Sequence, residues 1–281
     1  QFDGDPMVCY RVNLESRIAS RVLWQVASGG YRGEEDIYRI ALAPRWTDWF
    51  DAARTIRVDI SATKSPLTSL NFVTLKIKDA VCDKIRQLSQ RRPSVDTRAP
   101  DIPIQGHLTE RDFMLYLDTT GEPLFKRGQR LATGEAPLRE NLAAGILRLA
   151  GWAPGIALLD PMCGSGTILL EAAHMALDIA PGLGRHFAFE KFKNFDARHW
   201  RELVQRRSSR RKPATPQQIY GSDISGDLLR AARANLAGAG LENVVSLNRA
   251  DVLALTAPAK QGIIVTNPPY GVRLGEQQGL A

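Results

Sequence analysis

LLDPMCGSGT, residues 158–167, is the stretch that decides how the second half of this chain is expected to fold. Apolar residues run into an acid, Asp160, and a glycine-rich turn follows before a helical pattern begins near Ser165. A strand, a turn and a helix in this order hold nucleotide-like ligands at the carboxyl edge of a parallel sheet. Gly164 and Gly166 let the backbone approach a ligand closely, and the carboxylate of Asp160 favours a ligand that donates hydrogen bonds over a phosphate.

Two further acids follow apolar runs, at Asp223 in YGSD and at Asp251 in NRAD. The carboxylate of Asp223 can accept hydrogen bonds from two adjacent ribose hydroxyls, although it can equally cap the helix that begins at Ser225. Asp251 is placed to receive an adenine amino group at the same sheet edge. By itself the glycine-rich turn is also compatible with a tight turn that binds no ligand, since neither the GxGxxG nor the GxxxxGK[ST] pattern is present.

The stretch VTNPPYG, residues 265–271, ends a fourth apolar run with two prolines. Proline fixes φ and has no N–H, so Pro268 and Pro269 hold the carbonyl groups of this loop in a rigid arrangement. An exocyclic base amine is a poor nucleophile because its lone pair is delocalised into the ring. Acceptors on both of its hydrogens, the side-chain oxygen of Asn267 and the backbone oxygen of Pro268, would favour a tetrahedral nitrogen. Tyr270 would stack on the base, contributing on the order of 1–3 kcal/mol; a turn with a buried tyrosine is the alternative.

The rest of the chain divides into two regions, 1–120 and 121–281. In the first, the pattern predicts helical structure over 13–27 and 35–42, a strand over 55–62, a helix over 71–88 with a lysine-bearing face, and strands over 102–108 and 113–119. The second begins with a helix that has Pro137 at its start and Gly151 after its end, and then alternates strands and helices. Such alternation predicts a parallel sheet wound by helices.

Composition narrows the function classes. The chain has 281 residues, 44% of them hydrophobic, and no apolar run long enough for a membrane helix, so a cytoplasmic protein is expected. The net charge of +7 permits a polyanionic partner. The basic stretch RRSSRRK at 206–212 is either a solvated helix end or an RNA contact. The three cysteines and four histidines lack metal-site spacing, so reduced thiols and no metal are expected.

Taken together, DPMCGSG, GSD, RAD and NPPYG resemble the class I S-adenosylmethionine-dependent methyltransferases that modify amino groups of bases. RAPDIPIQGHL and FKRGQRLATGEAPLRENLAAGIL resemble the bacterial large-subunit (23S) ribosomal RNA guanine-N2 methyltransferases with an N-terminal THUMP domain. The resemblance implies a THUMP-like α/β module that binds RNA, followed by a Rossmann-like domain with a doubly wound sheet. It also implies that residues 125–145 close over the methionine end of the cofactor.

The resemblance further implies which residues act. Those expected to bind S-adenosylmethionine are Asp160, Pro161, Cys163, Gly164, Ser165, Gly166, Thr167, Asp223, Asp251 and Asn267. Those expected to act on the base are Asn267, Pro268, Pro269 and Tyr270. Cys163 is expected to be a small residue of the turn rather than a nucleophile, and Glu171 an ordinary residue of the helix after it.

The family's sheet has further strands after NPPYG, so a sheet incomplete at Ala281 is expected, and the first residues are expected to be the remnant of a ferredoxin-like part. Methylation of guanine N2 in transfer RNA, methylation of adenine N6 in DNA, and non-catalytic RNA binding on a methyltransferase scaffold remain open alternatives.

Overall fold

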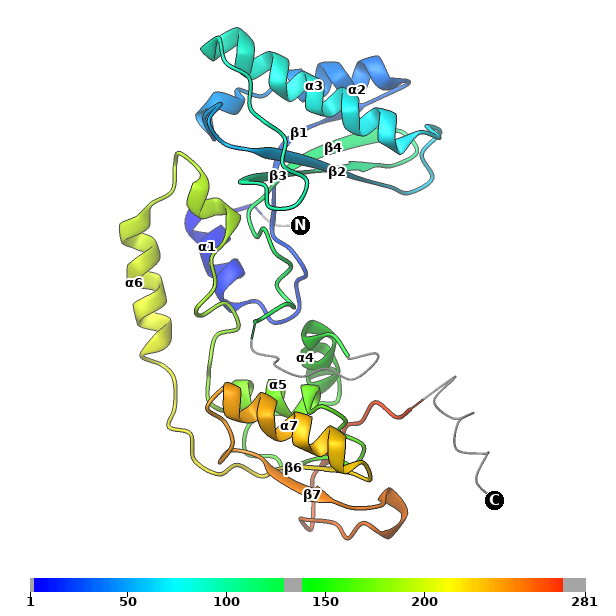
Figure 1. Cartoon of the computed structure of the whole chain (residues 1–281), viewed down its shortest axis with the longest axis vertical. Helices are drawn as coiled ribbons and strands as arrows, with labels where there is room; N and C mark the ends of the chain where they lie inside the picture. Colours follow the sequence, from blue (N-terminus) through cyan, green and yellow to red (C-terminus); the bar gives the residue numbers. More distant parts are fainter. Residues whose placement is uncertain (1–2, 129–137, 270–281) are drawn as a thin grey trace. The chain divides into compact units, whose positions relative to one another are not determined.

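The computed structural model describes residues 3–128 and 138–269, and its helices and strands form two compact units (Figure 1). The first unit comprises residues 1–13, 21–123 and 184–203, and the second comprises residues 14–20, 124–183 and 204–281. Each unit has its own sheet and its own apolar core. The N-terminal helix α1 spans Pro6–Glu15.

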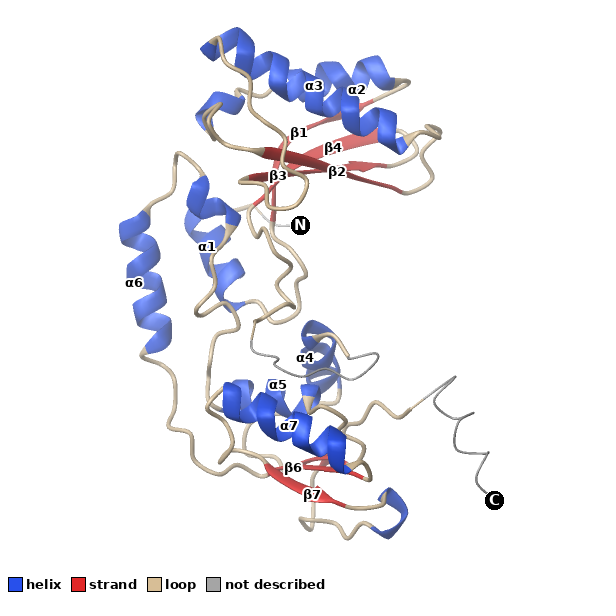
Figure 2. Cartoon of the chain, in the orientation of Figure 1, coloured by secondary structure: helices blue, strands red, loops and turns tan. Residues whose placement is uncertain are grey.

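The first unit is a four-stranded sheet with two helices on one face (Figure 2). Its strands lie in the order β1-β4-β3-β2; β2 and β3 are parallel and the other pairs are antiparallel. The elements are β1 (Leu23–Gly30), α2 (Glu34–Leu42), the short 3-10 helix η1 (Trp46–Asp48), β2 (Ile56–Ala62), α3 (Leu70–Ser89), β3 (Ile102–Leu108) and β4 (Asp112–Asp118). Ile77 of α3 and Ile104 and Phe113 of the sheet are completely buried between the two layers. The predicted strand, helix, strand, strand order is confirmed.

The prediction of helical structure over residues 13–27 is wrong beyond Glu15, where α1 ends. Residues from Leu23 onward form β1, which pairs along its length with β4, with an irregularity between Gln25 and Ala27. The local spacing of apolar residues there also suits a helix. The hydrogen bonds from a strand nearly a hundred residues later in the chain override it, because pairing and packing outweigh weak local propensity.

Helix α3 carries the lysine-bearing face that the sequence predicts. Ser69 caps its start by accepting a hydrogen bond from the Phe72 N–H at 3.3 Å, and Gln90 ends it in a left-handed conformation. Lys76 pairs with Glu35 and Lys78 pairs with Asp79. These acids reduce the net positive charge of the face.

The second unit contains a parallel sheet in the order β7-β6-β5-β8. Its elements are α4 (Glu140–Leu149), β5 (Leu158–Asp160), α5 (Thr167–Ala176), β6 (Ile219–Asp223), α7 (Gly226–Gly238), β7 (Ser246–Arg249), the 3-10 helix η3 (Val252–Ala254) and β8 (Ile263–Ile264). Helices α5 and α7 contact each other and lie on the same face of the sheet (Figure 1). The chain runs from β5 outward through β6 to β7 and returns on the other side with β8, so the carboxyl end of β5 is the switch point of the sheet. Pro137, the predicted start of α4, lies outside the described residues.

The stretch between β5 and β6 contains the 3-10 helix η2 (Ala188–Lys191) and α6 (Ala197–Ser208). The basic stretch at the end of α6 is not uniformly solvated. Arg207 is 8% exposed and pairs with Asp178 at 3.1 Å and with Glu15 at 3.6 Å. Arg206, Arg211 and Lys212 are exposed. Among the described residues, none of the helices combines the length and the apolar character that crossing a membrane requires.

Candidate functional site

The three acids predicted to follow strands lie along one edge of the parallel sheet of the second unit. Asp160 ends β5, Asp223 ends the neighbouring β6, and Asp251 follows β7. Asp160 and Asp223 are buried, at 1% and 8% exposure, whereas Asp251 is exposed. Asp251 caps η3 by accepting a hydrogen bond from the Leu253 N–H at 2.9 Å. Two buried carboxyl groups therefore lie at the carboxyl ends of adjacent strands, with a third acid farther along the edge.

The glycine-rich turn between β5 and α5 is fastened to β6 by backbone groups. Asp223 accepts one hydrogen bond from the Gly164 N–H and another from the Ser225 N–H, both at 2.9 Å. The Cys163 N–H donates to the Ser222 carbonyl at 2.9 Å. An ionised carboxylate has about four acceptor positions, so Asp223 keeps acceptor capacity for a ligand while it shapes the turn. Ser225 rather than Asp223 is the N-cap of α7, because its hydroxyl accepts a hydrogen bond from the Leu228 N–H at 3.4 Å. The capping interpretation of Asp223 is therefore wrong, and its contact with a ligand stays a prediction.

Glycines in and beside the turn are needed for two different reasons. Gly164 has a φ of +55°, and no atom lies within 4 Å of the position a Cβ would take, so its surroundings are open. Gly221 in β6 is the opposite case, because a Cβ there would lie 2.2 Å from Cδ1 of Leu169 on α5. Gly221 therefore allows α5 to pack closely on the sheet, a role that sequence reasoning missed although a glycine inside a strand pattern signals such close approach.

The carboxyl group of Asp160 is unusually basic. Burial raises its pKa from 3.8 to about 7; the Met162 N–H, 3.3 Å from Oδ1, opposes the shift, and the neighbouring carboxylate of Asp223 adds to it. A cationic or strongly donating group beside Asp160 would restore its ionised form. The site is therefore electrostatically suited to a ligand that brings positive charge to the end of β5.

The Asn-Pro-Pro loop follows β8 and lies next to the end of β5. The Ile263 N–H donates to the Ala157 carbonyl at 2.8 Å, and the Val265 N–H donates to the Leu159 carbonyl at 3.0 Å. Asn267 comes two residues later and is half-buried, and Pro268 and Pro269 are exposed. Within residues 3–128 and 138–269 the side chain of Asn267 has no hydrogen-bond partner, so its oxygen can accept one from a ligand. Tyr270 lies outside the described residues.

Cys163 lies in the turn and is buried. Burial raises the pKa of its thiol, and the nearby carboxylates of Asp160 and Asp223 raise it further. A raised pKa disfavours the thiolate that nucleophilic attack on a base ring would need. All three cysteines are free and buried, as expected of reduced thiols. No cluster of potential metal ligands occurs in the described parts of the chain.

Glu171 is not the ordinary helix residue that the sequence suggested. It is completely buried in α5, it forms an ion pair with Arg127, and its Oε2 lies 3.5 Å from Nη1 of Arg17. Arg17 also donates to the carbonyls of His174 and Ile179. A glutamate inside an otherwise apolar helix is the signal that indicates such a pair, because charged side chains are rarely buried without a partner. The three charged groups fix residues 14–20 and 124–128 against the helix that follows the glycine-rich turn.

The histidines have structural or surface positions, as expected. His174 is buried in α5, and burial together with the charge of Arg17 lowers its pKa to about 3, which keeps the ring neutral. Nδ1 of His107 lies 2.8 Å from the Ser61 hydroxyl, and Nδ1 of His186 lies 3.3 Å from Glu190 Oε2.

Comparisons with known proteins match both regions of the chain. Residues 31–118 match the THUMP domain family, and residues 127–281 match the family described as an RMKL-like methyltransferase domain. The chain is 42% identical over 281 residues to the ribosomal RNA large subunit methyltransferase K/L of Psychromonas ingrahamii, covering 98% of this chain and 37% of that protein. It is 36% identical to slr0064 of Synechocystis, named as a candidate RNA methyltransferase, covering 99% of this chain and 73% of that one.

Among solved structures, SMU.472 complexed with SAH matches with a TM-score of 0.87 and 30% identity, covering 96% of this chain and 72% of that one. The mixed α/β fold with a methyltransferase-type second part, predicted from the sequence, is confirmed.

Proposed function

This chain belongs to the RMKL-like methyltransferase family and carries a THUMP domain, and from that membership we propose that it methylates the exocyclic N2 of a guanine in large-subunit ribosomal RNA. The observation that carries the proposal is the shared sheet edge. The glycine-rich turn, buried Asp160 and Asp223, and the Asn-Pro-Pro loop all lie where β5, β6 and β8 end. Acceptors for a nucleoside and acceptors for a base amine thus lie on adjacent strands.

The cofactor of this family is S-adenosylmethionine, and the residues at the sheet edge fit it. S-adenosylmethionine supplies an activated methyl group on a positively charged sulfur. Asp160, whose pKa is raised to about 7, suits the cationic amino group of the methionine end, and Asp223 has acceptor positions left for ribose hydroxyls. The open space around Gly164 leaves room for close approach at the turn. The other residues that we propose to hold the cofactor are Pro161, Cys163, Ser165, Gly166, Thr167, Asp251 and Asn267.

The Asn-Pro-Pro loop is proposed to hold the guanine. The side-chain oxygen of Asn267 and the backbone oxygen of Pro268 would each accept one hydrogen of the exocyclic amine and direct its lone pair toward the activated methyl group. Pro269 would keep the loop rigid, and Tyr270 would stack on the base. Holding the amine in this orientation is how the residues accelerate the reaction, since positioning of reacting groups removes much of the entropic barrier.

The RNA substrate is proposed from the family and the THUMP match rather than from one contact. Residues 1–120 would bind RNA and residues 121–281 would carry out the transfer. A ribosomal RNA substrate would place the activity in the cytoplasm. The chain spans 37% of the Psychromonas relative, so the activity is proposed for the whole protein.

The test is methyl transfer from labelled S-adenosylmethionine by the full-length protein. Unmodified ribosomal RNA, transfer RNA and DNA are supplied separately, and the products are digested to nucleosides. We expect N2-methylguanosine in ribosomal RNA alone. N2-methylguanosine in transfer RNA would preserve the chemistry and change the substrate, and N6-methyladenine in DNA would overturn both base and substrate. RNA binding without any transfer would support a non-catalytic factor on this scaffold.

A further inference from the structure

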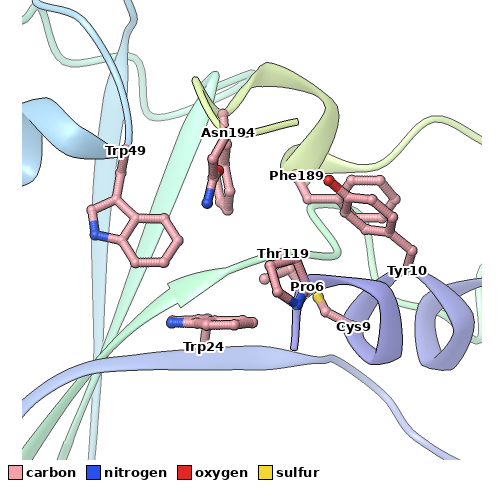
Figure 3. A pocket seen from close by; sticks show the side chains of 9 residues that line it. Pro6, Cys9, Tyr10, Trp24, Trp49, Thr119, Phe189 and Asn194 are labelled. Carbon is pink, nitrogen blue, oxygen red and sulfur yellow. The ribbon is translucent and has the colours of Figure 1, made fainter. Parts of the chain in front are cut away.

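The first unit contains a surface pocket lined mainly by aromatic rings (Figure 3). Trp24 of β1 forms its floor, Trp49 after η1 forms one side, and the side chain of Asn194 lies above Trp24 and beside Trp49. The remaining lining residues are Pro6, Cys9, Tyr10, Thr119, Phe189 and Phe192. Five separate parts of the chain, within residues 6–10, 24, 49, 119 and 189–194, therefore meet at this pocket.

Neighbouring contacts hold the pocket in shape. The Lys193 N–H donates to the Trp49 carbonyl at 2.8 Å, which fixes Asn194 beside that tryptophan. The ring of Phe192 meets the Trp49 ring edge to face at 6.1 Å, and the rings of Trp24 and Trp49 are 5.6 Å apart with a tilt of 59°. These contacts are made within the protein itself, so they hold the rings in position for a bound molecule.

The ligand-facing groups are accessible. Trp24 and Trp49 are partly exposed and Asn194 is exposed. The indole N–H groups of Trp46 and Trp152 donate to backbone carbonyls at 2.9 Å, but in the part of the chain that the structure describes those of Trp24 and Trp49 have no partner. The enclosed space is about 20 Å³, enough for about one water molecule. A ligand would therefore have to be flat and lie over the mouth of the pocket.

We propose that this pocket binds one unstacked nucleobase of the RNA, lying over the mouth of the pocket against the partly exposed rings of Trp24 and Trp49, with its edge against Asn194. Stacking on an aromatic ring suits every base, because each has a π-face. The carboxamide of Asn194 presents both a donor and an acceptor, which matches the edge of a base. No carboxylate is among the lining residues, which favours a neutral ring over a cationic ligand. The inference rests on the proposed RNA substrate and adds a second contact, separate from the sheet edge where transfer occurs.

The test uses the full-length protein and measures binding of a short oligoadenylate and of a fully paired RNA duplex by fluorescence anisotropy, with tryptophan quenching as the second signal. We expect oligoadenylate to quench the fluorescence. Trp24→Ala should weaken its binding by about 5- to 150-fold, whereas Trp24→Phe, which keeps a stacking surface, should lose little. Duplex binding and the affinity for S-adenosylhomocysteine should be unchanged. Tyr116→Ala is the matched control, because Tyr116 is a partly exposed aromatic residue of the same sheet that does not line the pocket.

Equal oligoadenylate affinity in wild type and Trp24→Ala, or no quenching in the wild type, would overturn the proposal. If Trp24→Ala fails to fold, Asn194→Ala replaces it, since Asn194 is exposed; unchanged oligoadenylate affinity in that variant would also count against the site. The outcomes separate this inference from the proposed function. If oligoadenylate binding depends on Trp24 but ribosomal RNA is not methylated, the proposed base-binding pocket stands and the proposed function fails. If ribosomal RNA is methylated and Trp24→Ala has an unchanged KM, the proposed function stands and the base-binding pocket fails.

Discussion

Replacing Asp160 with asparagine should make the cofactor-free protein more stable at pH 8 while weakening its affinity for the cofactor. The carboxyl group is 1% exposed, and burial raises its pKa from 3.8 to about 7. A carboxyl whose pKa is higher in the folded state holds its proton more tightly there. Its contribution to stability is therefore fully present below pH 3.8 and is lost as the pH rises to about 7. The difference between the two pKa values corresponds to about 4 kcal/mol of unfolding free energy.

Asparagine has nearly the same shape as aspartate, keeps an oxygen for the Met162 N–H and carries no charge. Asp160→Asn should therefore match the wild type near pH 4 and exceed its unfolding free energy at pH 8 by up to about 4 kcal/mol. Urea unfolding at a series of pH values, without cofactor, measures both. Asp251→Asn, at the exposed acid of the same edge, controls for a general loss of negative charge.

Addition of S-adenosylhomocysteine should reverse the order of stability. Its amino group would pair with ionised Asp160 in the wild type and find only a neutral amide in the variant. The same urea series in the presence of S-adenosylhomocysteine measures this second effect. A stability difference between wild type and Asp160→Asn that does not change between pH 4 and pH 8 would refute the conclusion that burial raises the pKa of the Asp160 carboxyl group.

Three further outcomes are expected. Asn267→Ala should abolish methyl transfer by the full-length protein but leave most of the S-adenosylhomocysteine affinity by calorimetry, because nine other residues are proposed to hold the cofactor; retained methylation would remove Asn267 from the mechanism. Gly221→Ala should lower the free energy of unfolding by about 1–3 kcal/mol, because its Cβ would overlap the Leu169 side chain; denaturation with an unchanged midpoint would contradict that packing. Glu171→Gln should lower the free energy of unfolding by about 3–5 kcal/mol, since it leaves the two buried guanidinium groups of Arg17 and Arg127 without a counter-charge. A loss below about 1 kcal/mol would mean that these charged groups are solvated in the folded protein.

The acids and the glycine-rich turn at the sheet edge could be predicted from the sequence, because each depends only on residues close to it in the chain. Each of the acids Asp160, Asp223 and Asp251 follows a short apolar run, and parallel strands place their carboxyl ends together. Gly164 and Gly166 lie next to one of these acids in the chain, so the turn and its open space belong to the same motif. The strands and the helix over 55–118 could be predicted for the same reason, since apolar periodicity identifies an element without knowledge of its partners.

The tertiary structure alone decided what depends on distant partners. Residues 23–30 form a strand because β4 pairs with them, although their own spacing also suits a helix. Glu171 pairs with Arg17 and Arg127, each more than forty residues away along the chain. Trp24 and Trp49 share a pocket with Asn194, which lies more than a hundred residues after them. A sequence pattern records what each residue prefers. Which buried charge finds a counter-charge and which rings meet is set by the free energy of packing, which only the assembled fold determines.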